Sequence, residues 1–92
     1  MEIQHESTDT KGTFFIEKDG KRVAEMTYSK AGTDKIIIDH TEADEAYRGE
    51  GLAKKLVFHG VEFARENELK VLPLCPYAKS VIQRNEELQD VL

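Results

Sequence analysis

The chain has 92 residues, of which 39% are hydrophobic and 34% are charged, and its formal net charge is −5. This size and composition predict one globular domain spanning residues 1–92 and exclude an intrinsically disordered chain. No apolar run approaches the roughly 20 residues of a membrane span, no basic patch indicates nucleic-acid binding, and one cysteine excludes an internal disulfide.

The first third of the chain predicts a β-hairpin. Residues 13–18 and 21–28 are rich in β-forming side chains, and Asp19-Gly20 stands between them. An Asp-Gly pair in this position is typical of a type I′ turn. Residues 3–6 indicate a short additional strand at the edge of the sheet.

A third strand is predicted at residues 35–41, where three consecutive isoleucines indicate burial on both faces and a central position. A helix is predicted from Gly51 to about residue 66, because apolar side chains recur at helical spacing. Phe58 is an exception, since it lies on the polar side of this helix. Asn67 can close the helix.

The last elements are a strand at residues 70–74 and a helix from residue 76 to about residue 84. A strand–helix–strand unit crosses over with a right hand, so the strands at 35–41 and 70–74 should be parallel. Ligands of such sheets bind beyond the carboxyl ends of the strands, where His40 and Cys75 stand.

The turn before the first helix has the composition of an anion-binding cradle. Its pattern is Arg48-x-x-Gly51-x-Ala53, in which small residues let a diphosphate approach the free N–H groups of the helix start. Arg48 or Lys54 can pair with phosphate oxygens. The spacing is neither that of the P-loop nor that of the dinucleotide-binding fingerprint. A glycine-rich helix start without a ligand is the ordinary alternative.

Three motifs in this order resemble a minimal, single-domain subgroup of the GNAT superfamily of acyl-CoA N-acyltransferases. They are His40-Thr41-Glu42, Tyr47-Arg48-Gly49-Glu50-Gly51-Leu52-Ala53 and Cys75-Pro76-Tyr77, and the resemblance covers residues 35–90. It implies an α+β fold: a mostly antiparallel sheet of four or five strands with a central, splayed parallel pair and two main helices. The family's usual N-terminal helices and C-terminal hairpin are missing from the pattern.

The resemblance also implies that acetyl-CoA or coenzyme A binds here as the acyl-donor substrate. Its pyrophosphate would lie on the second motif, and its acyl-pantetheine arm would enter the gap between the two parallel strands. The residues expected to contact coenzyme A are Thr41, Tyr47, Arg48, Gly49, Glu50, Gly51, Leu52, Ala53, Lys54 and Asn85. By default Asn85 is only a helix C-cap.

Cys75 and His40 are the candidate catalytic residues. Pro76 favours the first position of a helix, which makes Cys75 the N-cap, where N–H groups and the helix dipole stabilise a thiolate. His40 could take a proton from Cys75 or from an incoming amine, and Glu42 could orient it. The ordinary alternatives are a small buried hydrophobe for Cys75 and a histidine that shapes the turn for His40.

Tyr77 is a candidate general acid. It could protonate a departing thiolate, as the resemblance implies. The three histidines and one cysteine do not match zinc-ligand spacing, so no metal is predicted.

The leading functional hypothesis is an N-acetyltransferase that moves acetyl from acetyl-CoA to an amine, through acetyl-Cys75 or by direct attack. A non-catalytic module that binds coenzyme A or acyl-CoA and a Cys/His thioesterase are the alternatives. Residues 1–46 hold 6 Lys and Arg against 11 Asp and Glu, which would attract a cationic amine or simply keep the protein soluble. Residues 1–6 lack signal-peptide features, so we expect a cytoplasmic protein, and we expect a monomer.

Overall fold

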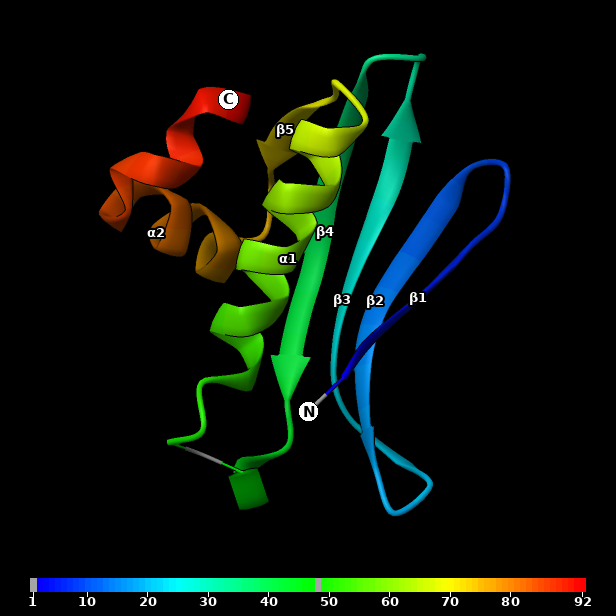
Figure 1. The fold of residues 1–92 in the computed structure, drawn as a ribbon, viewed down its shortest axis with the longest axis vertical. Helices are drawn as coiled ribbons and strands as arrows, with labels where there is room; N and C mark the ends of the chain where they lie inside the picture. The colour runs from blue at the N-terminus through cyan, green and yellow to red at the C-terminus, as the bar shows by residue number, and fades with distance from the viewer. Residues whose placement is uncertain (1, 48) are drawn as a thin grey trace.

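The computed structural model describes residues 2–47 and 49–92. It contains one five-stranded sheet in the order β1-β2-β3-β4-β5, with two α-helices and two short 3₁₀ helices (Figure 1). The strands are β1 (Ile3–Ser7), β2 (Lys11–Lys18), β3 (Lys21–Ala31), β4 (Lys35–Ala43) and β5 (Lys70–Pro73). The helices are η1 (Glu45–Tyr47), α1 (Leu52–Glu66), α2 (Pro76–Arg84) and η2 (Glu86–Val91). None of the helices in the described part of the chain is both long enough and apolar enough to cross a membrane.

Both α-helices cover the same face of the sheet, and no described helix covers the other face. Helix α1 packs across β2, β3, β4 and β5, and α2 packs beside it on β4 and β5. Figure 1 shows α1 in front of β4, with α2 beside it on the left. The core between these layers includes fully buried side chains from the strands and from α1, among them Phe14, Met26, Ile38, Leu56 and Val61.

The local sequence signals of the first half are confirmed. Strands β2 and β3 form the hairpin, and Asp19 and Gly20 have φ values of 52° and 76°. Two successive positive φ angles are the requirement of a type I′ turn. Among the described strands, β1 pairs only with β2, so it is the expected edge strand.

The helix predictions and the fold class are also confirmed. Helix α1 has Gly51 as its N-cap and Asn67 as its C-cap, and α2 begins at Pro76. Strands β4 and β5 are parallel, while every other neighbouring pair is antiparallel. The result is the mostly antiparallel α+β sheet with two main helices that the resemblance implies.

Two details of the sheet differ from expectation. Ile36 and Ile38 are 1% and 0% exposed, but Ile37 is only partly buried because it faces the side that no described helix covers. The prediction of burial on both faces of this strand is therefore wrong. The parallel pair is not central either, because β5 forms the edge of the described sheet.

Tyr28 occupies a space that a glycine leaves open. Its side chain is 1% exposed and lies over Gly12, which is its partner in the register of β2 and β3. A Cβ atom at Gly12 would overlap the Tyr28 ring. The Tyr28 hydroxyl is 2.7 Å from Nε2 of His5, so the buried phenol has a hydrogen-bond partner on β1.

Candidate functional site

Strands β4 and β5 separate after four paired residues. The ladder joins Lys35–Ile38 to Lys70–Pro73, and Pro73 has no N–H with which to extend it. The N–H groups of Leu74 and Cys75 both donate to the carbonyl oxygen of Ile38, at 3.1 and 3.0 Å, and this ends the pairing. Beyond Ile38, β3 is the only described strand that pairs with β4, so the splayed gap that the resemblance implies is present.

A β-bulge decides which way the side chains of β4 point next to this gap. The register between β3 and β4 shifts so that Tyr28 pairs with Ile38 but Thr27 pairs with His40, which leaves Asp39 as an extra residue. Residues opposite each other in an antiparallel pair share a face, and successive residues alternate. After the bulge, Thr41 therefore shares the helix-covered face, while His40 points to the uncovered face.

Cys75 lies on the helix-covered side of the gap, at the N-cap of α2. Its side chain is 5% exposed, and its S–H donates to Oγ1 of Thr41 at 3.6 Å. Burial raises the pKa of the Cys75 thiol, but the N–H of Ala78, the hydroxyl of Thr41 and the N–H of Tyr77 outweigh burial and hold the pKa below its usual value. The two N–H groups form no capping hydrogen bond of ordinary geometry with the thiol, so they act on the sulfur electrostatically.

His40 is not next to Cys75. Its side chain is 61% exposed on the uncovered face, with Nε2 3.2 Å from Oε2 of Glu42. The expectation that His40 lies opposite Cys75 is wrong, because the bulge at Asp39 turns His40 to the other face while Thr41 takes the position beside the sulfur. The structure does bring Glu42 to His40, as its proposed orienting role requires.

The backbone of the cradle depends on its two glycines. Gly49 and Gly51 have φ values of 93° and 68°, in the left-handed region that favours glycine. No side chain among residues 2–47 and 49–92 caps α1 with a hydrogen bond, so the N–H groups of its first turn can meet a ligand. A Cβ atom at either glycine would meet nothing within 4 Å, which leaves free space in front of these groups. Arg48 lies outside the described residues.

A cleft of about 260 Å³ joins this cradle to the start of α2. It is lined by Ala43, Asp44, Glu45, Tyr47, Gly49, Gly51, Leu52, Ala53 and Tyr77. The cleft therefore brings five of the predicted coenzyme A residues together with Tyr77, which is two residues from Cys75 along the chain.

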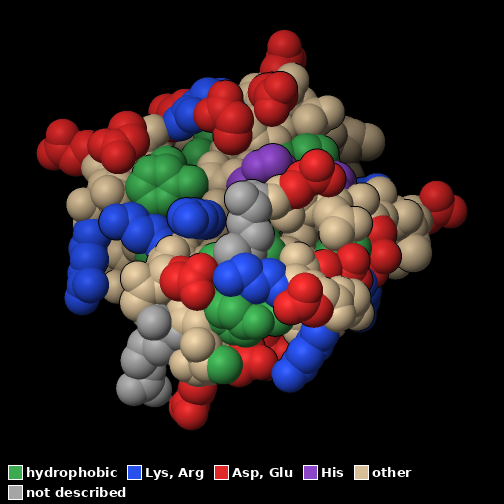
Figure 2. All heavy atoms as spheres, turned by 60° about the horizontal axis from the view of Figure 1, so that its bottom comes forward, with side chains coloured by type: hydrophobic (Ala, Val, Ile, Leu, Met, Phe, Trp, Pro, Cys, Tyr) green, Lys and Arg blue, Asp and Glu red, His purple; other side chains and the backbone are tan. Residues whose placement is uncertain are grey.

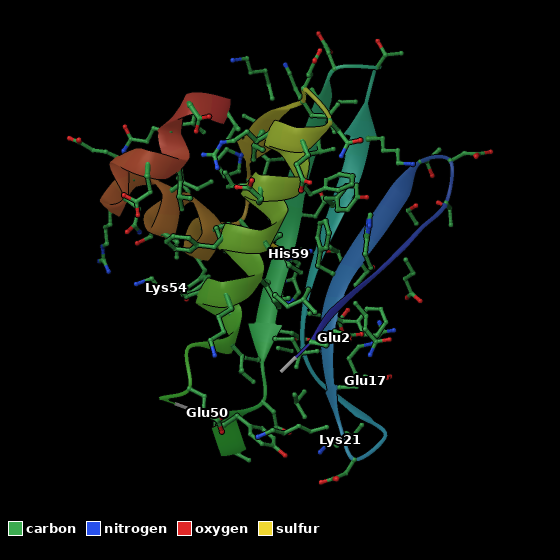
Figure 3. All side chains as sticks on the ribbon, viewed as in Figure 1. Glu2, Glu17, Lys21, Glu50, Lys54 and His59 are labelled. Carbon is green, nitrogen blue, oxygen red and sulfur yellow. The ribbon has the colours of Figure 1, made fainter. Side chains whose placement is uncertain are left out.

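Of these five residues, Leu52 is 2% exposed in the core, so only its backbone can meet a ligand. Three other predicted contacts stand in different surroundings. Glu50 lies on the loop before α1 (Figure 3), and its carboxylate pairs with the Lys18 ammonium group at 3.5 Å. Lys54 is exposed on α1 with Nζ 5.7 Å from the ring centre of Phe58. The Asn85 side chain donates to the Val81 carbonyl at 2.7 Å, and Asn85 is the C-cap of α2, which is the alternative to a coenzyme A contact given above.

Asp44 shapes the cradle loop, a role that differs from the orientation of His40 or the attraction of an amine that its acidic side chain suggested. Asp44 accepts the N–H of Ala46 at 2.9 Å and pairs with Lys21 at 3.3 Å. The hydrogen bond from the Ala46 N–H has the largest effect, and together with Lys21 it holds the pKa of Asp44 below its usual value. The Asp-x-Ala spacing of an Asx turn is the signal that could have identified this residue.

Comparison with known proteins gives a consistent result. A family model described as GCN5-related N-acetyl-transferase matches residues 13–91. The human and chicken proteins named NATD1 are each 34% identical to this chain over 62 residues, which is 67% of this chain and 55% and 56% of theirs. This chain thus spans little more than half the length of these relatives.

Solved structures agree with the fold. A GCN5-like protein from Staphylococcus aureus, determined by NMR, is 35% identical, with a TM-score of 0.69 over 98% of this chain and 85% of that one. A GNAT family N-acetyltransferase from Escherichia coli, crystallised in complex with CoA, is 24% identical, with a TM-score of 0.61 over 68% of this chain and 39% of that one. The second likeness shows the fold alone.

Proposed function

This chain belongs to the family of GCN5-related N-acetyltransferases, and we propose that it transfers an acetyl group from acetyl-CoA to an amine. The observation that supports this most is that one site holds both a place for a diphosphate and a place for a thioester. An uncapped helix start with two left-handed glycines lies at one end, and the Cys75–Thr41 pair lies in the splayed gap at the other. Acetyl-CoA has a diphosphate and a thioester at the two ends of one flexible arm.

The diphosphate binds at the first turn of α1. Its charge is met by the N–H groups of that turn, by the helix dipole and by the ammonium group of Lys54. Gly49 and Gly51 keep side chains away from the phosphate oxygens. The Glu50 carboxylate stays on Lys18, so it does not oppose the ligand.

The pantetheine arm follows the cleft from Gly51 to Tyr77 and enters the gap between β4 and β5. On this side of β4 the backbone of residues 39–43 has no strand partner in the described part of the chain. Its amide groups can therefore pair with the amides of the arm, as a neighbouring strand would. The thioester then reaches the side chains of Thr41 and Cys75.

The acetyl group passes through Cys75. The thiolate attacks the thioester carbonyl, the C–S bond to coenzyme A breaks, and Tyr77 gives a proton to the departing thiolate. An amine then attacks acetyl-Cys75 from the uncovered face of the sheet, and His40 accepts the proton that the amine loses. Cys75 leaves as a thiolate, and Tyr77 recovers its proton from solvent.

A cationic amine is the acceptor that suits this approach. The uncovered face carries the carboxylates of Glu25, Asp39 and Glu42 around His40, on β3 and β4. Their potential concentrates cations next to the gap. We further propose that the protein acts as a monomeric single domain in the cytoplasm, where a free thiol stays reduced.

Product analysis tests the proposed reaction. The protein is incubated with acetyl-CoA, with and without a polyamine, lysine or a short peptide with a free N-terminus. N-acetylated product supports the transferase. Release of acetate without any amine would instead identify a thioesterase, and binding of acetyl-CoA without turnover would identify a non-catalytic module.

A further inference from the structure

Exposed apolar side chains gather next to the gap between β4 and β5. Among the described residues, the large hydrophobic side chains that are exposed are those of Leu72, Leu74, Tyr77 and Leu92. The first three stand close to Cys75 in the chain, on either side of it. Tyr77 lines the cleft of the proposed donor. Leu72 and Leu74, which are 43% and 61% exposed, have no part in the site as described so far.

These two leucines face the side of the sheet that no described helix covers. Leu72 pairs with Ile37 in the parallel ladder, so the two side chains share a face. Ile37 is the partly buried isoleucine of that face. Leu74 follows Leu72 at the two-residue spacing that returns a strand to the same face, and its N–H donates to the Ile38 carbonyl at 3.1 Å. Ile37, Leu72 and Leu74 thus form an apolar strip along the gap.

Carboxylates lie at one end of this apolar strip. Asp39 accepts a hydrogen bond from the hydroxyl group of Ser29 at 2.6 Å, and Ser29 pairs with Ile37 across β3 and β4. The Asp39 carboxylate is therefore on the uncovered face, next to the strip. Glu42 lies further toward the end of β4, beside His40. An ammonium group is favoured at this end of the strip.

The other end of the strip is bounded by a lysine. Lys35 lies two residues before Ile37 on β4, so its side chain starts from the same face. The apolar stretch between the carboxylate end and this lysine is short, because Leu72 and Leu74 are about 7 Å apart along the strand direction. A cation that fits the strip should therefore be apolar, and not charged again, at its far end.

Charge alone would select poorly between amines at this site. Figure 2 looks onto the end of the molecule at which β4 ends, where acidic side chains stand among lysine and arginine side chains. The strip adds selection, since an amine gains free energy for each CH₂ group that it removes from water.

We propose that the acceptor is a small primary amine with an apolar body about 7 Å long, an inference that rests on the proposed function. The amine enters the gap beside His40 and Asp39, and its body lies on the apolar strip. Leu72 and Leu74 therefore determine specificity in the second half-reaction only, because the donor binds on the helix-covered side of the sheet.

Hexylamine and cadaverine test this preference, because they have equally many non-hydrogen atoms and differ in a terminal methyl group against a second ammonium group. N-acetylated product formed from acetyl-CoA is measured by mass spectrometry. The value of kcat/KM for hexylamine should be about tenfold higher, as expected if roughly two CH₂ groups leave water.

The variant Leu72→Ser/Leu74→Ser should lower kcat/KM for hexylamine about tenfold. It should leave both kcat/KM for cadaverine and the rate of Cys75 acetylation unchanged. Leu92→Ser is the matched control, since it removes a leucine that is 53% exposed at the other end of the last helices and should keep the preference.

Equal use of the two amines by the wild type, or a preference for cadaverine, would overturn the inference and leave the transferase intact. Acetylation of a peptide N-terminus without acetylation of hexylamine would do the same. Absence of N-acetylated product from every amine tested would overturn both the inference and the proposed function.

Discussion

The Sγ atom of Cys75 lies 3.6 Å from Oγ1 of Thr41, and this contact joins the start of α2 to β4 across the gap between the parallel strands. The thiol donates to the threonine oxygen. Once the sulfur is deprotonated, the hydroxyl group can rotate and donate to the thiolate. Thr41 is therefore a positioning residue for the proposed nucleophile, and His40 is separated from it by the bulge at Asp39.

Thr41→Val tests this contact, because valine keeps the shape of threonine without its hydroxyl. The pKa of Cys75 should rise, so the rate of iodoacetamide alkylation should reach its half-maximum at a higher pH than in the wild type. Thr41→Ser restores a hydroxyl and should return the profile toward that of the wild type. An identical pH profile in Thr41→Val would show that the Thr41 hydroxyl does not lower the pKa of Cys75.

His40→Ala separates the two half-reactions. Because His40 faces the amine side and not Cys75, the variant should form acetyl-Cys75 at the wild-type rate but pass it to an amine about 10²–10⁴-fold more slowly. Quenched single-turnover time courses with and without amine measure the two steps. Equal slowing of Cys75 acetylation would show that His40 acts on the thiol after all.

Gly51→Asp should abolish coenzyme A binding, because it sets a carboxylate against the diphosphate. The loss is measured as the disappearance of the ligand-induced rise in melting temperature. Gly20→Asp is the matched control: Gly20 also has a positive φ, of 76°, and open space around it, but it lies in the β2–β3 turn. Both variants pay the cost of a left-handed non-glycine residue, about 1–2 kcal/mol, and only Gly51→Asp should lose the ligand. Retained binding in Gly51→Asp is the contrary result.

Two glycine substitutions test the packing. Gly12→Ala should lower the free energy of unfolding by about 1–3 kcal/mol, since the new methyl group overlaps the buried Tyr28 ring. Gly60→Ala should cost less, because the one close contact of its methyl group is with the terminal Cε of the unbranched Met26 side chain, the Phe14 ring is at ordinary van der Waals distance, and alanine favours a helix. Urea denaturation gives both values, and the reverse order would contradict the packing described for Tyr28.

The sequence predicted those elements whose signals are local. The Asp19-Gly20 turn and the start of α2 at Pro76 each depend on conformational limits of one or two residues. The parallel pairing of β4 and β5 followed from the handedness of strand–helix–strand units.

The direction of His40 could not be predicted in the same way. It depends on one extra residue, Asp39, in the pairing of β4 with β3. The register of these two strands is set by packing along their whole length and not by the residues of the turn that joins them. Without the bulge, strict alternation from Ile38 would place His40 on the helix-covered face and Thr41 on the other.

Acid-quenched intact-mass spectrometry of the protein mixed with acetyl-CoA alone shows whether Cys75 becomes acetylated. We expect one added acetyl group on Cys75 in the absence of any amine, none in Cys75→Ala, and no transfer to an amine by Cys75→Ala although it still binds acetyl-CoA. Acid quenching preserves the thioester, which is nearly isoenergetic with that of acetyl-CoA. If Cys75→Ala instead acetylates an amine at the wild-type rate, Cys75 is not the nucleophile and the amine attacks acetyl-CoA directly.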